Sequence, residues 1–442
     1  MTIATLVNPA STLLRIILRI FRTLFLVFVS HLPGSEQAIK KISVANTGIL
    51  YHDGRALATC ESGPPIRVSL PGLETVGWFD GGRAEGEPAR ENVPGEVFGG
   101  HGLFSFMKEW TTAHPRVDPR TKELILFHST FLAPFVFYSI IPSSPTTHLL
   151  TQPSSRVVNA AIPGIKSAKM MHDFGVSSTH TVIMDLPLSL DPRNLARNEP
   201  VVSYDPSGRS RFGVFPRRHP EAVRWFETNP CCIFHTANSW DEASLNPLTE
   251  KTETTAVNML VCRLTSASLV FSAGDVAAPI PKPVTSPRYL AEEEQCRLYY
   301  YRFALSSSGN KITHQFALTA MPFEFPSVRD DMSMSSARYI YGCSVSDSTF
   351  GAALGRAVKI DSLVKMKEVV CRVQLPQRVP YGLHGNWFSE QEILRQRPVE
   401  RIRRLPVRKA KGELLSDVES EADSLSMNLW MSVRRWMLDV VG

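Results

Sequence analysis

Short runs of β-forming residues follow one another from Ile42 onward, and clusters of Pro, Gly, Asp or Ser end each run. β-Branched and aromatic residues dominate runs such as ELILFHSTFL, THTVIMDLPLSL and CRLYYYRFALS, and turn sequences such as DPRTK and DPSGRS separate them. Long helical periodicity is nearly absent from the middle of the chain. The pattern therefore predicts an all-β fold, and it leaves a sandwich, a barrel and a propeller open.

Four histidines in unrelated sequence contexts are the candidate metal ligands. They are His114 in TTAHPRVDP, His172 in MMHDFGV, His235 in IFHTANSWDE and His384 in RVPYGLHGNWF. Any one of them alone would be interpreted as a structural residue of the core or surface. They lie so far apart in sequence that only a closed tertiary structure could bring them together. An all-imidazole set without cysteine indicates iron, copper or zinc.

Composition sets the broad class of the protein. With 442 residues, 43% hydrophobic and 20% charged, the chain can bury a sizeable core as one large or two ordinary domains. The net charge of +6 is modest, and no basic stripe with recognition-helix context accompanies it, so no nucleic-acid partner is expected. Seven cysteines without a CxxC pair indicate reduced thiols in an intracellular protein.

The N-terminal stretch from Leu13 to Leu32 is apolar but carries Arg15, Arg19 and Arg22 at helical spacing. Three arginines on one face argue against a membrane-spanning helix and favour an interfacial amphipathic helix or a transit-type segment. A secretory signal is disfavoured because the arginines interrupt its apolar region. It also remains open that this stretch lies outside the fold.

The four histidine motifs carry a family resemblance. AHPRVDP, MHDFGV, FHTANSWDE and RVPYGLHG occur in this order, and together the chain from Ile42 to His384 resembles the carotenoid cleavage oxygenases, a family of non-haem iron enzymes. Within this family, the sequences around GLETVGWFDG and FETNPCCIFHTANSWD are most similar to the fungal torulene-cleaving branch. Stilbene-cleaving relatives have a lysine where this chain has Cys60, which argues against a stilbene substrate.

The resemblance implies an all-β, seven-bladed β-propeller with iron on its axis, capped by a dome of loops. Residues 36–390 would form this domain, after a basic apolar segment at 1–35 and before an extension at 391–442 with a terminal helix. The family's N-terminal blade and the strands expected near Lys365, upstream of the fourth histidine, have no counterpart here. We therefore expect an incomplete propeller.

The resemblance also implies the roles of individual residues. The metal Fe(2+) would be bound by His114, His172, His235 and His384, while Glu61 in ATCESGPP and Glu324 in MPFEFPSV would orient ligand rings. The family's third orienting glutamate, which would stand beside His384, is missing. No catalytic residue beyond the metal centre is predicted. The remaining histidines are interpreted as structural, among them His128, His148, His180, His219 and His314.

The implied activity is iron(II)-dependent cleavage of one C=C bond of a carotenoid by O₂, with torulene as the substrate and an apocarotenal as a product. One alternative is cleavage of another apocarotenoid. The other is a truncated, catalytically impaired chain that binds apocarotenoid or does not fold productively. The expected partners are O₂ and an apolar carotenoid, with peripheral lipid contact left open. The expected location is intracellular, either cytoplasmic or peripherally membrane-associated.

Overall fold

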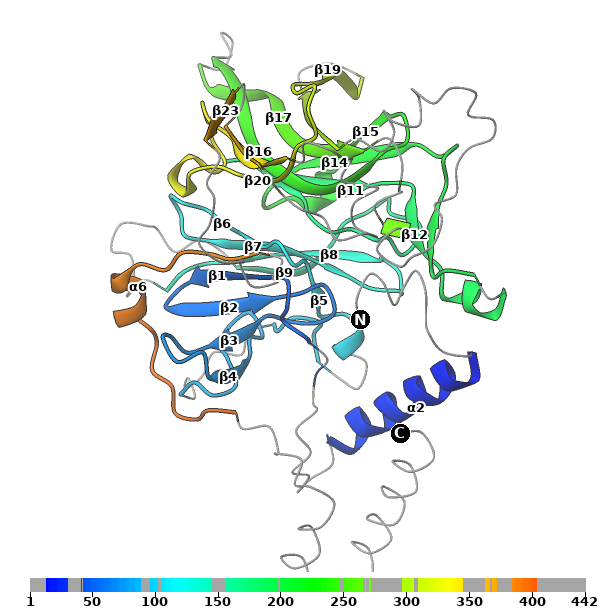
Figure 1. Cartoon of the computed structure of the whole chain (residues 1–442), viewed down its shortest axis with the longest axis vertical. Coiled ribbons are helices and arrows are strands. Elements are labelled where there is room, and N and C mark those ends of the chain that lie inside the picture. The colour runs from blue at the N-terminus through cyan, green and yellow to red at the C-terminus, as the bar shows by residue number, and fades with distance from the viewer. Residues whose placement is uncertain are drawn as a thin grey trace, which may run out of the picture.

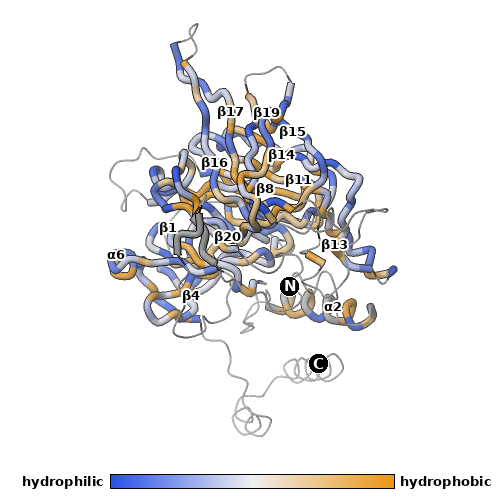
Figure 2. The backbone as a smooth tube through the Cα atoms, turned by 45° about the horizontal axis from the view of Figure 1, so that its top comes forward, coloured by the Kyte–Doolittle hydropathy of each residue, from blue (hydrophilic) through white to orange (hydrophobic). Residues whose placement is uncertain are grey.

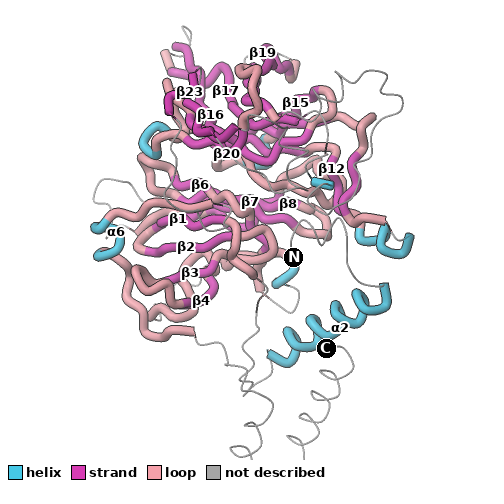
Figure 3. Tube along the Cα trace, viewed as in Figure 1, coloured by secondary structure: helices cyan, strands magenta, loops and turns pink. Residues whose placement is uncertain are grey.

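A computed structural model describes most of the chain, and every structural statement below concerns the residues that it describes. These are residues 13–30, 41, 43–88, 96–101, 105–144, 156–197, 199–245, 250–264, 267, 270–271, 296–305, 309–344, 362–365, 368–371 and 384–403. Strands dominate this part of the chain, and helices are few (Figures 1 and 3). The predicted all-β class is confirmed. The predicted C-terminal helix and His148 lie outside the described residues.

The first two sheets are antiparallel and follow each other along the chain. The first has the order β1-β2-β3-β4, with strands β1 (Gly48–His52), β2 (Arg55–Thr59), β3 (Ile66–Val68) and β4 (Thr75–Trp78). The second has the order β5-β7-β8-β9 with β6 beside β7, from β5 (Trp110–Thr111), β6 (Arg116–Val117), β7 (Leu124–Ser129), β8 (Val136–Ile141) and β9 (Val157–Ala161).

The third sheet has the order β10-β11-β14-β15, and a two-stranded ribbon, β12-β13, is inserted within it in the sequence. These strands are β10 (Gly175–Val176), β11 (His180–Asp185), β12 (Leu188–Leu190), β13 (Val202–Tyr204), β14 (Ser210–Pro216) and β15 (Arg224–Thr228). The fourth sheet, β16-β17-β18-β19, comprises β16 (Cys232–Leu245), β17 (Thr252–Leu264), β18 (Arg297–Ala304) and β19 (Lys311–Ala317).

The fifth sheet has the order β20-β21-β22-β23, with β20 (Glu324–Ser327), β21 (Tyr341–Ser344), β22 (Ser362–Lys365) and β23 (Glu368–Cys371). The sequences on either side of the expected gap near Lys365 thus pair directly, with Lys365 opposite Glu368. Consecutive four-stranded antiparallel sheets are the building plan of a propeller. The described strands make five such units, counting the sheet with the extra strand β6, where the family resemblance implies seven blades.

Among the described residues, the helical elements with defined bounds are short pieces and one longer helix. They are the α-helices α2 (Leu13–Ser30) and α6 (Glu390–Leu394) and the 3₁₀ turns η1 (Ser105–Met107), η2 (Pro192–Arg197), η3 (Pro220–Ala222) and η4 (Asp330–Met332). Ser389 begins α6 with a capping box, in which its hydroxyl accepts from the Glu392 N–H. No helix in the described part of the chain is long and apolar enough to cross a membrane.

Local sequence explains why the strands turn where they do. Between β1 and β2, His52 pairs with Arg55, so the loop is only two residues long. Asp53 and Gly54 both have positive φ, at 50° and 78°, which is the backbone of a type I′ hairpin turn. Asp-Gly is a favoured pair for that turn because glycine has no Cβ to clash in the left-handed region.

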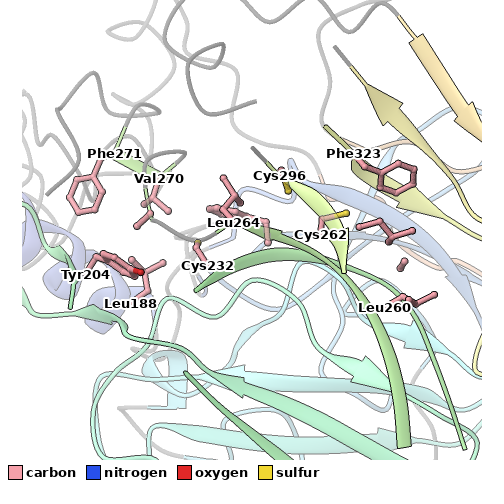
Figure 4. Packing of buried hydrophobic residues seen from close by; sticks show 14 of the residues in the cluster. Leu188, Tyr204, Cys232, Leu260, Cys262, Leu264, Val270, Phe271, Cys296 and Phe323 are labelled. Carbon is pink, nitrogen blue, oxygen red and sulfur yellow. The ribbon is translucent and has the colours of Figure 1, made fainter. Parts of the chain in front are cut away.

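Apolar side chains fill the space within and between the sheets. Figure 2 shows apolar residues concentrated along β8, β11 and β14. The largest buried cluster joins the ribbon β12-β13 to sheets four and five, and Figure 4 shows its packing around Cys232, Cys262 and Phe323. Six cysteines within the described residues are free thiols, and five of them are buried.

The segment from His384 to Arg403 returns to the first sheet (Figure 1). The backbone N–H of His384 donates to the Thr47 carbonyl at 3.1 Å, that of Arg397 to Gly54 at 2.9 Å, and that of Arg403 to Thr75 at 2.7 Å. The last candidate ligand is therefore seated against the first strands of the domain. This return joins the two ends of the β-rich region.

Candidate metal centre

The four candidate histidines come from four separate places in the fold and meet at one point. His114 lies between β5 and β6, His172 precedes β10, and His235 lies within β16. His384 follows the fifth sheet in sequence and lies against the first. One ring nitrogen from each histidine lies within 4.8 Å of the corresponding nitrogen of every other. His172 and His235 are buried, whereas His114 and His384 are partly exposed.

The rings surround a common centre edge-on. The centroid of the His114 ring lies 4.6 Å from that of His172, 5.1 Å from that of His235 and 4.7 Å from that of His384. The planes of these pairs meet at 63°, 81° and 86°. Rings crossed in this way direct their nitrogen edges inward and do not stack.

The spacing of the nitrogens suits a metal ion. The Nε2 atom of His172 lies 2.9 Å from that of His114 and 3.3 Å from that of His235. Two imidazole nitrogens bound to one ion at about 2.1 Å and at a right angle would lie roughly 3.0 Å apart. When His172 and His235 both carry their proton on Nδ1, their Nε2 lone pairs face each other, and a shared cation would relieve this repulsion. Four nitrogen donors suit iron, copper or zinc.

Two glutamates hold two of the rings from behind. The Nδ1 atom of His172 is hydrogen-bonded to Oε1 of Glu61, and Nδ1 of His235 lies 2.6 Å from Oε2 of Glu324. A carboxylate accepts from N–H, so Nδ1 carries the proton in both rings. The Nε2 lone pair then faces the centre, which is the tautomer that a ligand needs. These are the two glutamates named from the sequence.

The protonation of the rings follows from burial and from these carboxylates. Burial holds the pKa of His114 well below its ordinary value and lowers the pKa of His384 to about 4. Burial also acts to lower the pKa of His172, but the Glu61 carboxylate outweighs it and raises that pKa. His172 in turn lowers the pKa of Glu61 against the opposing effect of burial. His114 and His384 are therefore neutral near pH 7 and able to coordinate.

The backbone directly after Glu324 is strained. The next residue, Phe325, has φ of 52°, which a bulky side chain rarely adopts. The register between β20 and β21 is irregular between Glu324 and Ser327. This irregularity places the Phe325 ring 5.4 Å from the His235 ring and 5.7 Å from the His384 ring, with the Glu324 carboxylate behind His235. One local distortion thus supplies both an orienting carboxylate and an aromatic wall.

His384 is held differently from the other rings. Within the described part of the chain, no carboxylate is hydrogen-bonded to its ring, in line with the glutamate missing from the sequence. Its backbone N–H bond to Thr47 and its packing against Gly48 place it instead. A Cβ at Gly48 would lie 3.9 Å from the His384 Cβ, which is an ordinary van der Waals contact, so the two residues lie side by side without requiring glycine there.

Sequence reasoning missed Asp173, Arg116 and Thr236. Asp173 is buried beside His172 and accepts hydrogen bonds from Arg116 and Thr236, which lie within the His114 and His235 motifs. Thr112 adds a further link, because its hydroxyl donates to the His172 carbonyl at 2.8 Å. The signal that could have found them is their position within two residues of a candidate ligand.

The other described histidines stay apart from this group. His128 is buried and lies 2.8 Å from the Ser139 hydroxyl, and His180 lies 2.7 Å from the Thr179 hydroxyl. His219 pairs with Glu221 at the surface, and His314 is exposed. None belongs to the nitrogen cluster.

A protein-family comparison matches residues 10–367 to the model described as RPE65, retinal pigment epithelial membrane protein. The match includes α2 and three of the four histidines, and His384 lies beyond it.

Curated proteins give two informative matches. Carotenoid dioxygenase carX of Gibberella fujikuroi is 43% identical over 552 aligned residues, covering 93% of this chain and 78% of that protein. That alignment is longer than the 442-residue chain, so the relative has residues without a counterpart here. The carotenoid 9,10(9′,10′)-cleavage dioxygenase 1 of Phaseolus vulgaris is 29% identical over 68% of this chain, and the match covers 46% of that protein. The matched region thus spans less than half the length of that plant protein.

Solved structures show the same architecture. Lignostilbene dioxygenase of Pseudomonas brassicacearum matches 75% of this chain and 60% of its own, with a TM-score of 0.53 and 22% identity. Cobalt-substituted ACO of Synechocystis matches 80% of this chain and 77% of its own, with a TM-score of 0.50 and 16% identity. At these identities the matches show a shared fold.

Proposed function

The chain belongs to the RPE65 family of carotenoid oxygenases, and on that premise we propose that it is an iron(II)-dependent dioxygenase. It uses O₂ to split one C=C bond of a carotenoid into two carbonyl products. The observation that carries the proposal is the convergence of four imidazoles, two of them fixed by glutamates so that Nε2 faces the centre.

The donor set supports iron as the ion. Iron(II) bound by four neutral imidazoles would keep its full charge, leave coordination positions open and supply the redox chemistry that activates O₂. His114, His172, His235 and His384 would hold it. Glu61 and Glu324 keep His172 and His235 in the coordinating tautomer, and no proton has to move on these rings for the ligands to act.

The surroundings of the centre suit a hydrocarbon substrate. The Phe234 ring lies 5.5 Å from the His172 ring, and Phe325 lies beside His235 and His384. A polyene has no hydrogen-bonding groups, so aromatic walls can position it by packing and exclude water around it. The similarity to a fungal carotenoid dioxygenase, together with the motifs around Trp78 and His235, favours torulene as the substrate and an apocarotenal as the product.

Helix α2 supports contact with a lipid surface, where such a substrate would be found. Leu14 and Phe21 are each 66% exposed and Phe28 is 48% exposed, and they recur every seven residues on one face of the helix. Arg15 and Arg22 lie beside that face, and the helix contains no acidic residue. An exposed apolar stripe bordered by arginines suits the headgroup region of an anionic membrane. We propose an intracellular protein bound peripherally to such a membrane.

A second candidate is a chain that binds a polyene without cleaving it. Two observations favour this candidate. Within the described residues, no carboxylate is hydrogen-bonded to the His384 ring, and the fungal relative has residues that have no counterpart in this chain. Loss of one orienting partner typically weakens metal binding or activity about 10- to 100-fold.

Two measurements on the full chain separate these candidates. Purified protein should contain about one iron per chain, and it should bleach torulene and consume O₂. His235→Ala should lose both iron and bleaching, while the matched control His314→Ala, at an exposed site away from the centre, should keep both. Iron at one per chain without bleaching supports the binding protein. Iron-free wild-type protein contradicts the proposed metal centre.

A further inference from the structure

Asp173 is the most heavily hydrogen-bonded carboxylate near the candidate metal centre, although it is not a ligand. Its side chain is 1% exposed. Oδ1 lies 2.7 Å from the Phe174 N–H nitrogen and 2.8 Å from Nη2 of Arg116. Oδ2 lies 2.7 Å from Nη2 of Arg116, 2.7 Å from the backbone nitrogen of Thr236 and 3.0 Å from its hydroxyl. Four donor groups therefore surround one buried carboxylate.

These donors come from the segments that carry the histidines. Arg116 follows His114 by two residues, Asp173 follows His172 directly, and Thr236 follows His235 directly. The same Nη2 atom of Arg116 also lies 2.7 Å from the Thr236 hydroxyl and 3.2 Å from its carbonyl oxygen. A single ion pair thus joins three segments that lie about 60 residues apart in the sequence, with separations of 57, 63 and 120 residues between the bonded partners.

The backbone of β16 is deformed at this point. The register between β16 and β17 shifts between Ile233 and Thr236, and again between Thr236 and Asn238. Such bulges release a backbone N–H from the ladder and redirect the neighbouring side chain. Here the Thr236 N–H donates to Asp173. The bulge lies beside His235, and Asp173 accepts the hydrogen bond from the Thr236 N–H that the bulge frees from the ladder.

Asp173 is not placed to bind the ion itself. Its oxygens are occupied by donors, and the group of possible ligand atoms in the described residues contains the four histidines without it. Glu61 and Glu324 fix the rotation and tautomer of single rings. Asp173 acts instead on the Thr236 and Phe174 main chain and on the Arg116 side chain, and so on the distances between the three segments that carry the rings.

We propose that Asp173, paired with Arg116, is a positioning residue that sets the mutual spacing of His114, His172 and His235. The inference rests on the proposed metal centre and adds a role that the glutamates do not have. Asp173→Asn keeps the size and one acceptor oxygen but removes the charge that Arg116 and the Thr236 N–H share.

The test uses cobalt(II) as the probe ion, because its visible absorption reports ligand geometry. The full chain, stripped of metal, is titrated with cobalt(II) against a chelator. Asp173→Asn should bind cobalt 10- to 100-fold more weakly than wild type. At saturating cobalt its visible spectrum should differ from that of wild type, because the ligand spacing has changed.

Asp185→Asn is the matched control. Asp185 is also buried, at 4% exposure, and pairs with Arg211 and Lys169 without contacting any of the four histidines. The variant Asp185→Asn should lower the melting temperature. Its cobalt affinity should stay within about twofold of wild type, and its cobalt spectrum should be unchanged. Should Asp173→Asn fail to fold, Thr236→Val removes only the hydroxyl and keeps the side-chain shape, and it should show the same spectral change with a smaller loss of affinity.

Three outcomes decide the matter. Weaker binding with an altered spectrum in Asp173→Asn, and neither in Asp185→Asn, supports the inference. Wild-type affinity and spectrum in Asp173→Asn overturn it and leave the proposed metal centre standing. Wild-type protein that binds no cobalt overturns the metal centre, and the inference with it.

Discussion

The Nδ1 atom of His235 lies 2.6 Å from Oε2 of Glu324, and both side chains are buried. The pairing joins the fourth sheet to the first strand of the fifth, across 89 residues of sequence. A buried carboxylate without a partner would be strongly destabilising, so ring and carboxylate each require the other. The pair therefore couples the packing of two sheets to the tautomer of one candidate ligand.

Glu324→Gln should weaken metal binding without unfolding the chain. The amide keeps an acceptor oxygen but loses the charge that stabilises Nδ1–H on His235. The affinity of the protein for iron should therefore fall about 10- to 100-fold. The measurement is iron retained after dialysis against a graded chelator. Glu242→Gln is the control, because Glu242 pairs with Arg302 at the surface. Equal iron retention in both variants would refute the role of Glu324.

Arg397→Ala should destabilise the chain and loosen His384. Arg397 donates to the Asp53 carboxylate at 2.8 Å and to the Ser144 hydroxyl at 2.6 Å, and it holds the returning segment on the first sheet. Asp53 keeps Arg55 as a partner at 2.9 Å, so we expect a loss of about 1–3 kcal/mol in unfolding free energy. Denaturant unfolding measures the loss, and chelator-driven iron release measures the effect on His384. Arg395→Ala, at an exposed neighbouring position, should change neither quantity.

Acid should destabilise the fold through buried neutral histidines. Burial lowers the pKa of His128 to about 3 and that of His52 to about 4. The unfolded chain takes up these protons near pH 6.5, whereas the folded chain does not, so stability is complete above pH 6.5 and falls as the pH drops toward 4. Each group contributes about 1.4 kcal/mol per pH unit over that range. His128→Gln should remove one such contribution from the slope of unfolding free energy between pH 6 and pH 5. An unchanged slope would show that the pKa of His128 is not lowered in the folded chain.

Replacing two exposed rings of the apolar stripe of α2 should weaken lipid binding. The double variant Phe21→Ser and Phe28→Ser removes two exposed rings from one face, while Arg15 and Arg22 remain. Co-sedimentation with phosphatidylglycerol vesicles should fall at least tenfold, and wild-type binding should weaken as salt is raised. Iron content should stay at the wild-type level, because the helix contributes no ligand. Binding that survives the double variant would place the lipid contact elsewhere.

Much of the candidate site follows from short stretches of sequence. Each histidine stands in its own local motif, and Glu61 and Glu324 stand in motifs of the same family, so their identities can be read without a structure. The all-β class follows in the same way, since runs of β-branched and aromatic residues between turn sequences encode strands locally. The direct pairing of β22 with β23 could not be anticipated, because the resemblance indicated only that strands were missing between them.

Contacts between segments that are distant in the sequence cannot be predicted from the residues around each partner. Nothing around Asp173 in the sequence says that Arg116 and Thr236 will reach it, nor that the backbone of His384 will rest on Thr47. The strand-forming class can be read from residue type and near neighbours, whereas the candidate ligands and two of their carboxylate partners can be read from motifs that resemble those of a known family. The spacing of the nitrogens and the contacts that hold them depend on the folded chain, because packing and hydrogen bonding among sheets remote in the sequence fix those distances.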